Sequence, residues 1–486
     1  MKNVIIKFNS LPVQVRAGFA FLLCTVFQRA FTIITTPIFT RLLTTAEYGK
    51  YSVFISWMGI ISCFVTLSIS SAIYPQAIVK FDEEREKYSS AMQSLTVVLI
   101  VMWFGIYFLS HDFWNKLFSL NTSQMAAMFV IMWTHAIFGF WSAEQRVVYK
   151  YKKLFFVTFF VSVLQPILCV SFIYLFTNKV SGLVWGIAIA GLVAYIFLFA
   201  EQMKRGKLFF SKSYWCYALK LAVPLIPHYL SVIVLNSSDR IMIRNLTGSS
   251  ADVGIYNLAY TISMCGLLIN QAMLQTFSPW LYYKIKNQQF YDIKSITYPV
   301  VILIAGINLC VILFTPEILA FFAPPSYWAA IWVMPPITMS VFFMFLYNLF
   351  SAFEFYYEKT HYISIATVTG SVLNIILNYV FIKHYGYLAA GYTTLFCYFF
   401  FAVMHYYFMK KICRELLKDV KVYDLKILSG ITAAFIILSF LIMCTFEYSL
   451  LRYSLICIII IELFVRRNII VKFISQLINT KKTSFE

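Results

Sequence analysis

Long apolar stretches separated by short polar segments run along the whole chain. A helix needs roughly 20 apolar residues to span the hydrocarbon core of a bilayer, and the stretches have about this length. The pattern therefore predicts fourteen transmembrane helices. We expect them at 17–36, 51–74, 90–110, 125–143, 154–176, 182–200, 219–243, 254–281, 297–315, 327–351, 361–382, 386–409, 427–446 and 450–465.

The composition supports an integral membrane protein. Of 486 residues, 61% are hydrophobic and 12% are charged, whereas about a quarter of a soluble domain is charged. The net charge of +19 does not indicate a nucleic-acid partner, because the Lys and Arg residues lie in short loops between apolar stretches. In such loops they set the orientation and contact anionic membrane lipids.

The distribution of Lys and Arg predicts the orientation. If the N-terminus is cytoplasmic, the inner segments hold 29 of the 39 Lys and Arg residues and the outer segments hold 8. Because positive residues are enriched in cytoplasmic loops, we expect both termini in the cytoplasm. No outer segment is long enough for a catalytic domain, so we do not expect an enzyme. The ten cysteines lie singly, without metal-site spacing, and predict neither a metal nor a disulfide framework.

The chain contains an internal repeat with an offset of 203 to 209 residues. Arg41-Leu-Leu-Thr44 with Gly49-Lys-Tyr51 matches Arg244-Asn-Leu-Thr247 with Gly254-Ile-Tyr256. Further matches follow in the same order: Ser162-Val-Leu-Gln165 with Ser371-Val-Leu-Asn374, and Gly182 and Gly186 with Gly386 and Gly391. A repeat of six helices is even-numbered, so both copies insert in the same orientation, related by a pseudo-twofold axis along the membrane normal.

The repeat predicts an all-α fold of two six-helix lobes followed by two additional helices. We expect an N-lobe at 1–203, a cytoplasmic linker at 204–218, a C-lobe at 219–410, helices thirteen and fourteen at 427–466, and a cytoplasmic tail at 467–486.

The residues Arg41-Leu-Leu-Thr-Thr-Ala-Glu-Tyr-Gly-Lys-Tyr51 after an apolar first helix resemble the polysaccharide transporters of the MOP superfamily, the Wzx-type flippases of O-antigen and other lipid-linked oligosaccharides. The Asp239-Arg240 pair followed by Gly254-Ile-Tyr256 is similar to the second-lobe counterpart, and the resemblance covers residues 10 to about 410. It implies a flippase of the bacterial inner membrane. Such a protein moves undecaprenyl-diphosphate-linked repeat units to the outer leaflet by alternating access, without a cofactor.

The resemblance leaves several properties open. These are the sugar repeat and the final polysaccharide, coupling to H⁺ or Na⁺, and association with a polysaccharide polymerase and a chain-length regulator.

Arg29 is the main candidate for substrate binding. It lies about 12 residues into the first predicted helix, roughly 18 Å along it. A charge at that depth usually faces a wet cavity or a partner. Thr25, Thr32 and Thr36 lie on the same face of the helix, so we expect a polar stripe facing a central cavity, with a buried pair as the structural alternative.

The second lobe supplies the other candidates. His228 and Asp239 share one face of helix seven, and Arg240 adjoins them near its outer end, where we expect partial exposure. For His228 a packing role competes with a binding role, and for the Asp239-Arg240 pair an interfacial anchor does. Gln271 and Gln275 on helix eight offer uncharged amides that suit sugar hydroxyls.

The charges of the predicted lumen favour an anionic substrate. Helices one to six contain no Asp or Glu away from their ends, whereas an exporter of cationic drugs would be expected to keep one. A multidrug or lipid II exporter of the same superfamily remains the alternative. A membrane polymerase or ligase acting on the same lipid carrier would need a large outer loop.

Overall fold

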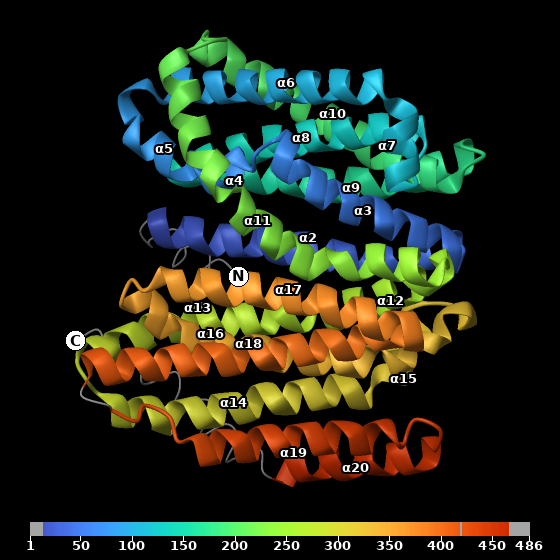
Figure 1. The fold of residues 1–486 in the computed structure, drawn as a ribbon, viewed down its shortest axis with the longest axis vertical. Helices are drawn as coiled ribbons and strands as arrows, with labels where there is room; N and C mark the ends of the chain where they lie inside the picture. The colour runs from blue at the N-terminus through green and yellow to red at the C-terminus, as the bar shows by residue number, and fades with distance from the viewer. Residues whose placement is uncertain (1–12, 418–419, 466–486) are drawn as a thin grey trace, which may run out of the picture. The chain divides into compact units, whose positions relative to one another are not determined.

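The computed structural model describes residues 13–417 and 420–465, and every regular element in these ranges is a helix (Figure 1). The longer helices are α2 (Val13–Leu42), α3 (Thr45–Val65), α6 (Arg85–Leu109), α8 (Thr122–Val147), α9 (Tyr151–Leu175), α10 (Lys179–Gly206), α11 (Lys212–Thr247), α12 (Ser250–Ser263), α13 (Gly266–Lys286), α14 (Phe290–Leu313), α16 (Met334–Tyr356), α17 (Thr360–Tyr385), α18 (Tyr387–Leu416), α19 (Leu425–Met443) and α20 (Ser449–Val465). Short elements connect them: α4 (Ile69–Ala72), α5 (Tyr74–Lys80), η1 (Asp82–Glu84), α7 (His111–Phe118), α15 (Thr315–Phe322) and η2 (Pro325–Trp332).

Twelve helical stretches of the described residues are long and apolar enough to cross a membrane. The two remaining predicted spans correspond to α3 and to α20, of which Ser449–Ile458 counts as a shorter apolar helix. The prediction of an all-α, multi-pass membrane protein is confirmed.

Two predicted spans are interrupted. The span predicted at 51–74 ends as α3 at Val65, because Leu67 and Ser68 adopt the left-handed backbone conformation with φ of 51° and 48°. The span predicted at 254–281 consists of α12 and α13, with a break at 264–265. Hydropathy does not detect such breaks, because a residue's backbone conformation does not change its polarity.

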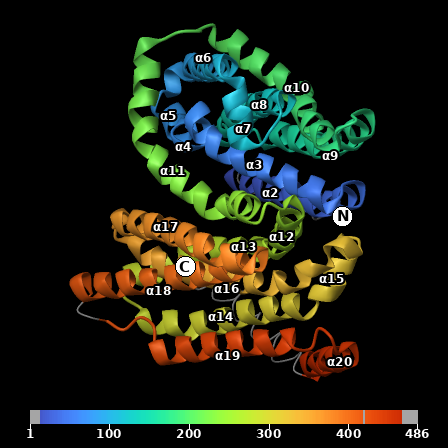
Figure 2. The same cartoon turned by 45° about the vertical axis from the view of Figure 1, so that its right-hand side comes forward.

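Contacts between residues divide the chain into two compact units. The first comprises the residues up to Asn257 with Phe322–Pro324 and Asn378–Tyr387, and the second comprises Leu258–Phe321, Pro325–Leu377 and the residues from Leu388 onward. The first unit therefore includes α11, which the repeat assigns to the second lobe. The helix belongs to this unit because it packs along α3, and Figures 1 and 2 show that it curves strongly along its length. Pro224 and Pro227 lie within it, and proline is a common cause of such bends.

The first unit is built around α8 and α10, which pack on each other and on α6 and α9. Close approach of α10 to α9 depends on two glycines of the repeat. A Cβ atom at Gly182 would lie 2.3 Å from the carbonyl oxygen of Phe172, and one at Gly186 would lie 2.6 Å from the Cα of Cys169. A second core joins α5 to α8, where the rings of Tyr74 and Phe140 lie 4.8 Å apart.

The second unit packs α16 against α13, α14 and α19. The rings of Phe342 in α16 and Phe435 in α19 are both fully buried and lie 4.3 Å apart. Helix α19 belongs to the pair predicted to follow the repeat, and it covers part of the core of this unit.

Candidate functional site

A polar cavity of about 280 Å³ lies inside the first unit, between α2, α8, α9 and α10. Its hydrogen-bonding side chains are neutral, and its walls include aromatic rings. No Asp, Glu, Lys or Arg is among the described residues that line it. The polar lining consists of Gln28, Thr32, Thr35, His135, Thr158, Ser162, Gln165 and Tyr195. Such a cavity can hydrogen-bond the hydroxyl groups of a ligand and pack against its apolar surface.

Among the described side chains of the predicted polar stripe of α2, one reaches this cavity. Thr32 lines it, whereas Thr25 and Thr36 do not, and their hydroxyls donate to the carbonyls of Phe21 at 3.1 Å and Thr32 at 2.7 Å. The backbone of α2 is helical through Arg29, but the side chain of Arg29 lies outside the described part of the structure. Its role as a phosphate ligand stays a prediction.

Asp239 and Arg240 lie in a buried hydrogen-bond network of the first unit. The Tyr256 hydroxyl donates to Asp239 Oδ2 at 2.5 Å, and the Asn378 amide donates to Asp239 Oδ1 at 2.6 Å. Arg240 Nε donates to Asn257 Oδ1 at 3.0 Å, and its guanidinium lies 5.8 Å from the centre of the Tyr256 ring.

Asp239 is 1% exposed and Arg240 is 7% exposed, so the expected partial exposure of Arg240 is wrong. Uncharged side chains of α12 and α17 hydrogen-bond to Asp239 and Arg240, which allows both charged residues to be buried. The hydropathy of α11 alone cannot reveal partners on other helices. The network connects α11 to α12 and α17.

The remaining candidates are distributed over both units. His228 is half-buried on α11, with its ring 5.4 Å from that of Tyr229. Gln271 and Gln275 have exposed side chains on α13 of the second unit. That these residues and Arg29 line one cavity stays a prediction.

Two glycines at equivalent positions of the repeat meet within the first unit. A Cβ atom at Gly49 would lie 1.7 Å from the carbonyl oxygen of Ser250, and one at Gly254 would lie 2.1 Å from that of Thr45. Gly49 and Gly254 are 205 residues apart in the sequence, and so are the residues they contact, Thr45 and Ser250. The contact is therefore reciprocal, as across a twofold axis. Any side chain at either glycine would push the starts of α3 and α12 apart.

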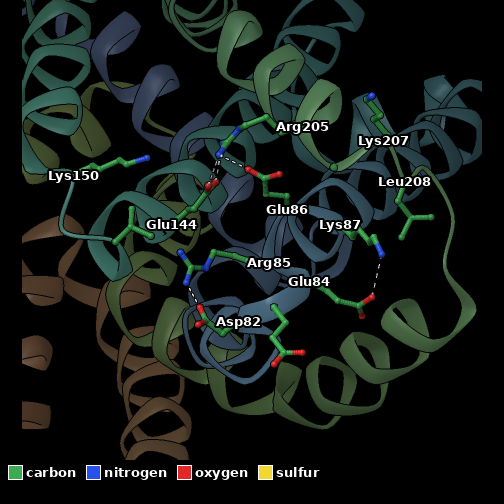
Figure 3. A pocket seen from close by; sticks show the side chains of 13 residues that line it. Asp82, Glu84, Arg85, Glu86, Lys87, Glu144, Lys150, Arg205, Lys207 and Leu208 are labelled. Carbon is green, nitrogen blue, oxygen red and sulfur yellow. Dashed lines mark hydrogen bonds and ion pairs between the residues drawn. The ribbon is translucent and has the colours of Figure 1, made fainter.

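A second, more open pocket of about 700 Å³ lies at one end of α6, α8 and α10 (Figure 3). Ten of its thirteen described lining residues are charged. Arg205 donates to Glu144 Oε1 at 2.9 Å and lies 3.5 Å from a carboxylate oxygen of Glu86. The Gln202 amide also donates to Glu144, at 2.7 Å. Glu144 is 4% exposed, so Arg205 and Gln202 together stabilise a buried carboxylate.

The sequence patterns did not identify Glu144 or most of the polar cavity. Glu144 follows the predicted span at 125–143, so it was assigned to a loop, whereas α8 continues to Val147. Gln165 was noticed only as part of the repeat. An amide directly before a proline in an otherwise apolar helix is a signal that could have identified it.

A family model and several solved structures resemble this chain. The model of a family described as polysaccharide biosynthesis protein matches residues 15–283, which is over half of the chain. No curated protein sequence matches it.

Several solved structures share its fold. A lipid II flippase, MurJ, in an inward closed conformation aligns with a TM-score of 0.65 at 15% identity, covering 92% of this chain and 99% of that one. An inward-facing multidrug resistance MATE family transporter of the MOP superfamily aligns with a TM-score of 0.64 at 15% identity, covering 80% and 96%. A MOP superfamily transporter from Pyrococcus furiosus aligns with a TM-score of 0.55 at 14% identity, covering 82% and 95%. The predicted fold class, that of the MOP superfamily transporters, is confirmed.

Proposed function

Because this chain belongs to the polysaccharide biosynthesis protein family, we propose that it is a flippase for lipid-linked oligosaccharides. It moves an undecaprenyl-diphosphate-linked repeat unit from the cytoplasmic to the outer leaflet of a bacterial inner membrane by alternating access. The repeat unit then enters a surface polysaccharide such as O-antigen. The protein itself makes or breaks no covalent bond in this process.

The observation that carries the proposal is the neutral polar cavity of the first unit. Amide and hydroxyl groups from α2 and α9 can both donate and accept hydrogen bonds. The hydroxyl groups of a sugar can do the same, so the two sets of groups match. Its volume of about 280 Å³ lies just below the roughly 300–1,000 Å³ of typical ligand sites, a size suited to a small part of an oligosaccharide. The described lining contains no acid, which a site for exporting cationic drugs would be expected to offer.

Arg29 is proposed to bind the diphosphate. It lies one residue after Gln28, which lines the cavity, on the same helix. An unpaired guanidinium within the membrane costs several kcal/mol, so a residue at this depth requires an anionic or carbonyl partner. Arg is preferred over Lys because it grips phosphate oxygens with two parallel hydrogen bonds.

Complementation of a flippase-null strain tests the proposal. Arg29→Ala should abolish surface polysaccharide, and Arg29→Lys should retain part of it. Gln165→Ala should reduce the rate of production about fivefold, the effect of losing roughly 1 kcal/mol of hydrogen bonding. The control is Ser171→Ala on the same helix, because Ser171 is exposed and its hydroxyl donates only to its own helix, at 2.9 Å from the carbonyl oxygen of Ile167. Full polysaccharide from well-expressed Arg29→Ala and Gln165→Ala would contradict both assignments.

A multidrug or lipid II exporter is the alternative, and the same strains distinguish it. Complementation of a lipid II flippase mutant, or increased drug resistance without surface polysaccharide, would favour these exporters instead.

A further inference from the structure

A third pocket, of about 270 Å³, lies in the first unit between α3, α6, α7 and α8. Seven of its thirteen described lining residues are aromatic, and the other six are Ile, Val, Leu or Met. It shares no lining residue with the polar cavity or with the charged pocket. A dry apolar cavity of roughly 150 Å³ is large enough to bind benzene, so this pocket has room for a segment of a hydrocarbon chain.

Helix α7 lies at the membrane boundary, because it joins the ends of two stretches that can cross a membrane, Asp82–Leu109 and Thr122–Val147. An amphipathic helix in that position turns its apolar face toward the hydrocarbon and its polar face toward the lipid headgroups. The pocket, which α7 lines from its apolar face, therefore lies just below the level of the headgroups.

Side-chain contacts hold α7 in place on its neighbours. The ring of Phe118 lies 4.8 Å from that of Trp57 in α3. Asn115 accepts a hydrogen bond from the Tyr107 hydroxyl of α6 and donates one to the Thr122 hydroxyl of α8, both at 2.9 Å. This wall of the pocket is therefore anchored to three helices, so the pocket is formed before a ligand enters.

The two faces of α7 carry different side chains. Trp114, Leu117 and Phe118 line the pocket from one face. Because successive residues of a helix are rotated by about 100°, Asp112 and Lys116 lie on the opposite face. Leu117 lines the pocket and is nevertheless 50% exposed. The pocket therefore opens toward the surrounding lipid, on the side of α7 that leads round to Lys116.

The charged face of α7 matches a headgroup that carries both charges. Lys116 takes part in no ion pair with the described residues, and Asp112, whose side chain is 94% exposed, approaches the imidazole of His111 at 3.7 Å. Residues four apart on a helix have Cβ atoms about 6 Å apart. A phosphate and a primary ammonium group joined by two carbon atoms can therefore reach Lys116 and Asp112 together.

A polar atom of α7 also lines the pocket. The Nε1 atom of Trp114 is buried and donates to no described residue, whereas a buried indole N–H usually has an acceptor. The ester carbonyl groups of a glycerophospholipid lie between its headgroup and its chains, and therefore next to α7, where they can accept this hydrogen bond. A polyprenyl diphosphate has no ester at that place.

We propose that this pocket binds phosphatidylethanolamine, with part of one acyl chain among the aromatic rings. The phosphate pairs with Lys116, the ammonium group pairs with Asp112, and an ester carbonyl accepts from Trp114. Each part of the lipid thus meets a group of matching chemistry. The inference does not depend on the substrate that the protein transports.

Photo-cross-linking of the purified full-length protein tests the proposal. The protein is placed in phosphatidylcholine nanodiscs with a trace of phosphatidylethanolamine whose acyl chain carries a diazirine, and the cross-linked residues are mapped by mass spectrometry. We expect cross-links within 57–65 and 103–129. Unlabelled phosphatidylethanolamine should displace the probe. Phosphatidylglycerol, which has no ammonium group, should compete about fivefold less well, the effect of losing one exposed ion pair.

Three variants and a matched control sharpen the test. Ile61→Trp fills the pocket and should abolish these cross-links, whereas Val101→Trp, at a 63% exposed position of α6 outside the pocket, should retain them. Trp114→Phe keeps a ring without the N–H and should weaken binding about fivefold. Asp112→Asn changes an exposed side chain and should remove the preference over phosphatidylglycerol.

Three results would overturn the proposal. The first is cross-links that fall only outside the pocket, or that persist in well-folded Ile61→Trp. The second is equal competition by phosphatidylethanolamine and phosphatidylglycerol in the wild type. The third is stronger competition by undecaprenyl phosphate than by phosphatidylethanolamine, which would assign the pocket to the carrier lipid.

Discussion

Two buried carboxylates, Glu144 near the end of α8 and Glu354 near the end of α16, lie 210 residues apart in the two repeats and have different partners. Glu144 lies at the edge of an open charged pocket (Figure 3), and Arg205 also approaches Glu86 and Glu201 at 3.5 and 3.8 Å. Glu354 of α16 is fully buried, and its Oε1 lies 2.7 Å from Nδ1 of His405 of α18, which is its one ion-pair partner among the described residues. The duplicated helices thus share a carboxylate near the same helix end, bound by a guanidinium and an amide in one unit and by an imidazole in the other.

The largest effect is expected from His405→Ala. Removal of one partner of a fully buried pair costs about 3–5 kcal/mol when the other partner stays charged. Glu354 has no other ion-pair partner among the described residues, so the loss in unfolding free energy should be about 3 kcal/mol. Unfolding in mixed micelles measures it. A loss below about 1 kcal/mol would show that Glu354 does not need its partner.

Arg205→Ala should have a smaller effect. The side chain of Arg205 is 29% exposed, so water can partly replace it, and we expect a loss of about 2 kcal/mol. Arg205→Lys should lose less stability than Arg205→Ala, because lysine keeps the charge but cannot form the two parallel hydrogen bonds that Arg205 donates to Glu144. The same mixed-micelle experiment checks both variants. A loss as large as that of His405→Ala would remove the distinction between the two sites.

The sequence predicted the approximate positions of the twelve helical stretches that can cross a membrane, because hydropathy depends on local composition. The repeat was also visible, since Gly49 and Gly254 are needed for a reciprocal backbone contact that admits no side chain. The breaks after Val65 and at 264–265 were not visible, because they depend on backbone conformation and tertiary contacts.

The candidate site could be predicted only in part. Thr32 was placed on a polar face of the first helix, and it lines the cavity, but His135 and Gln165 come from helices whose polar residues are isolated in sequence. Arg240 was expected near water, and Asn257 instead binds it in a buried network. Such partners lie on other helices, so the pattern of a single helix cannot show them.

The central claim is that the protein moves lipid-linked oligosaccharides across a membrane, and reconstitution tests it most directly. Purified protein is placed in liposomes that contain a fluorescent lipid-diphosphate-linked oligosaccharide in both leaflets. A membrane-impermeant oxidant then modifies the sugars that reach the outer surface. We predict that modification proceeds beyond the outer-leaflet fraction when the protein is present, and that it slows in Arg29→Ala. Modification that stops at the outer-leaflet fraction, as in protein-free liposomes, would contradict the account.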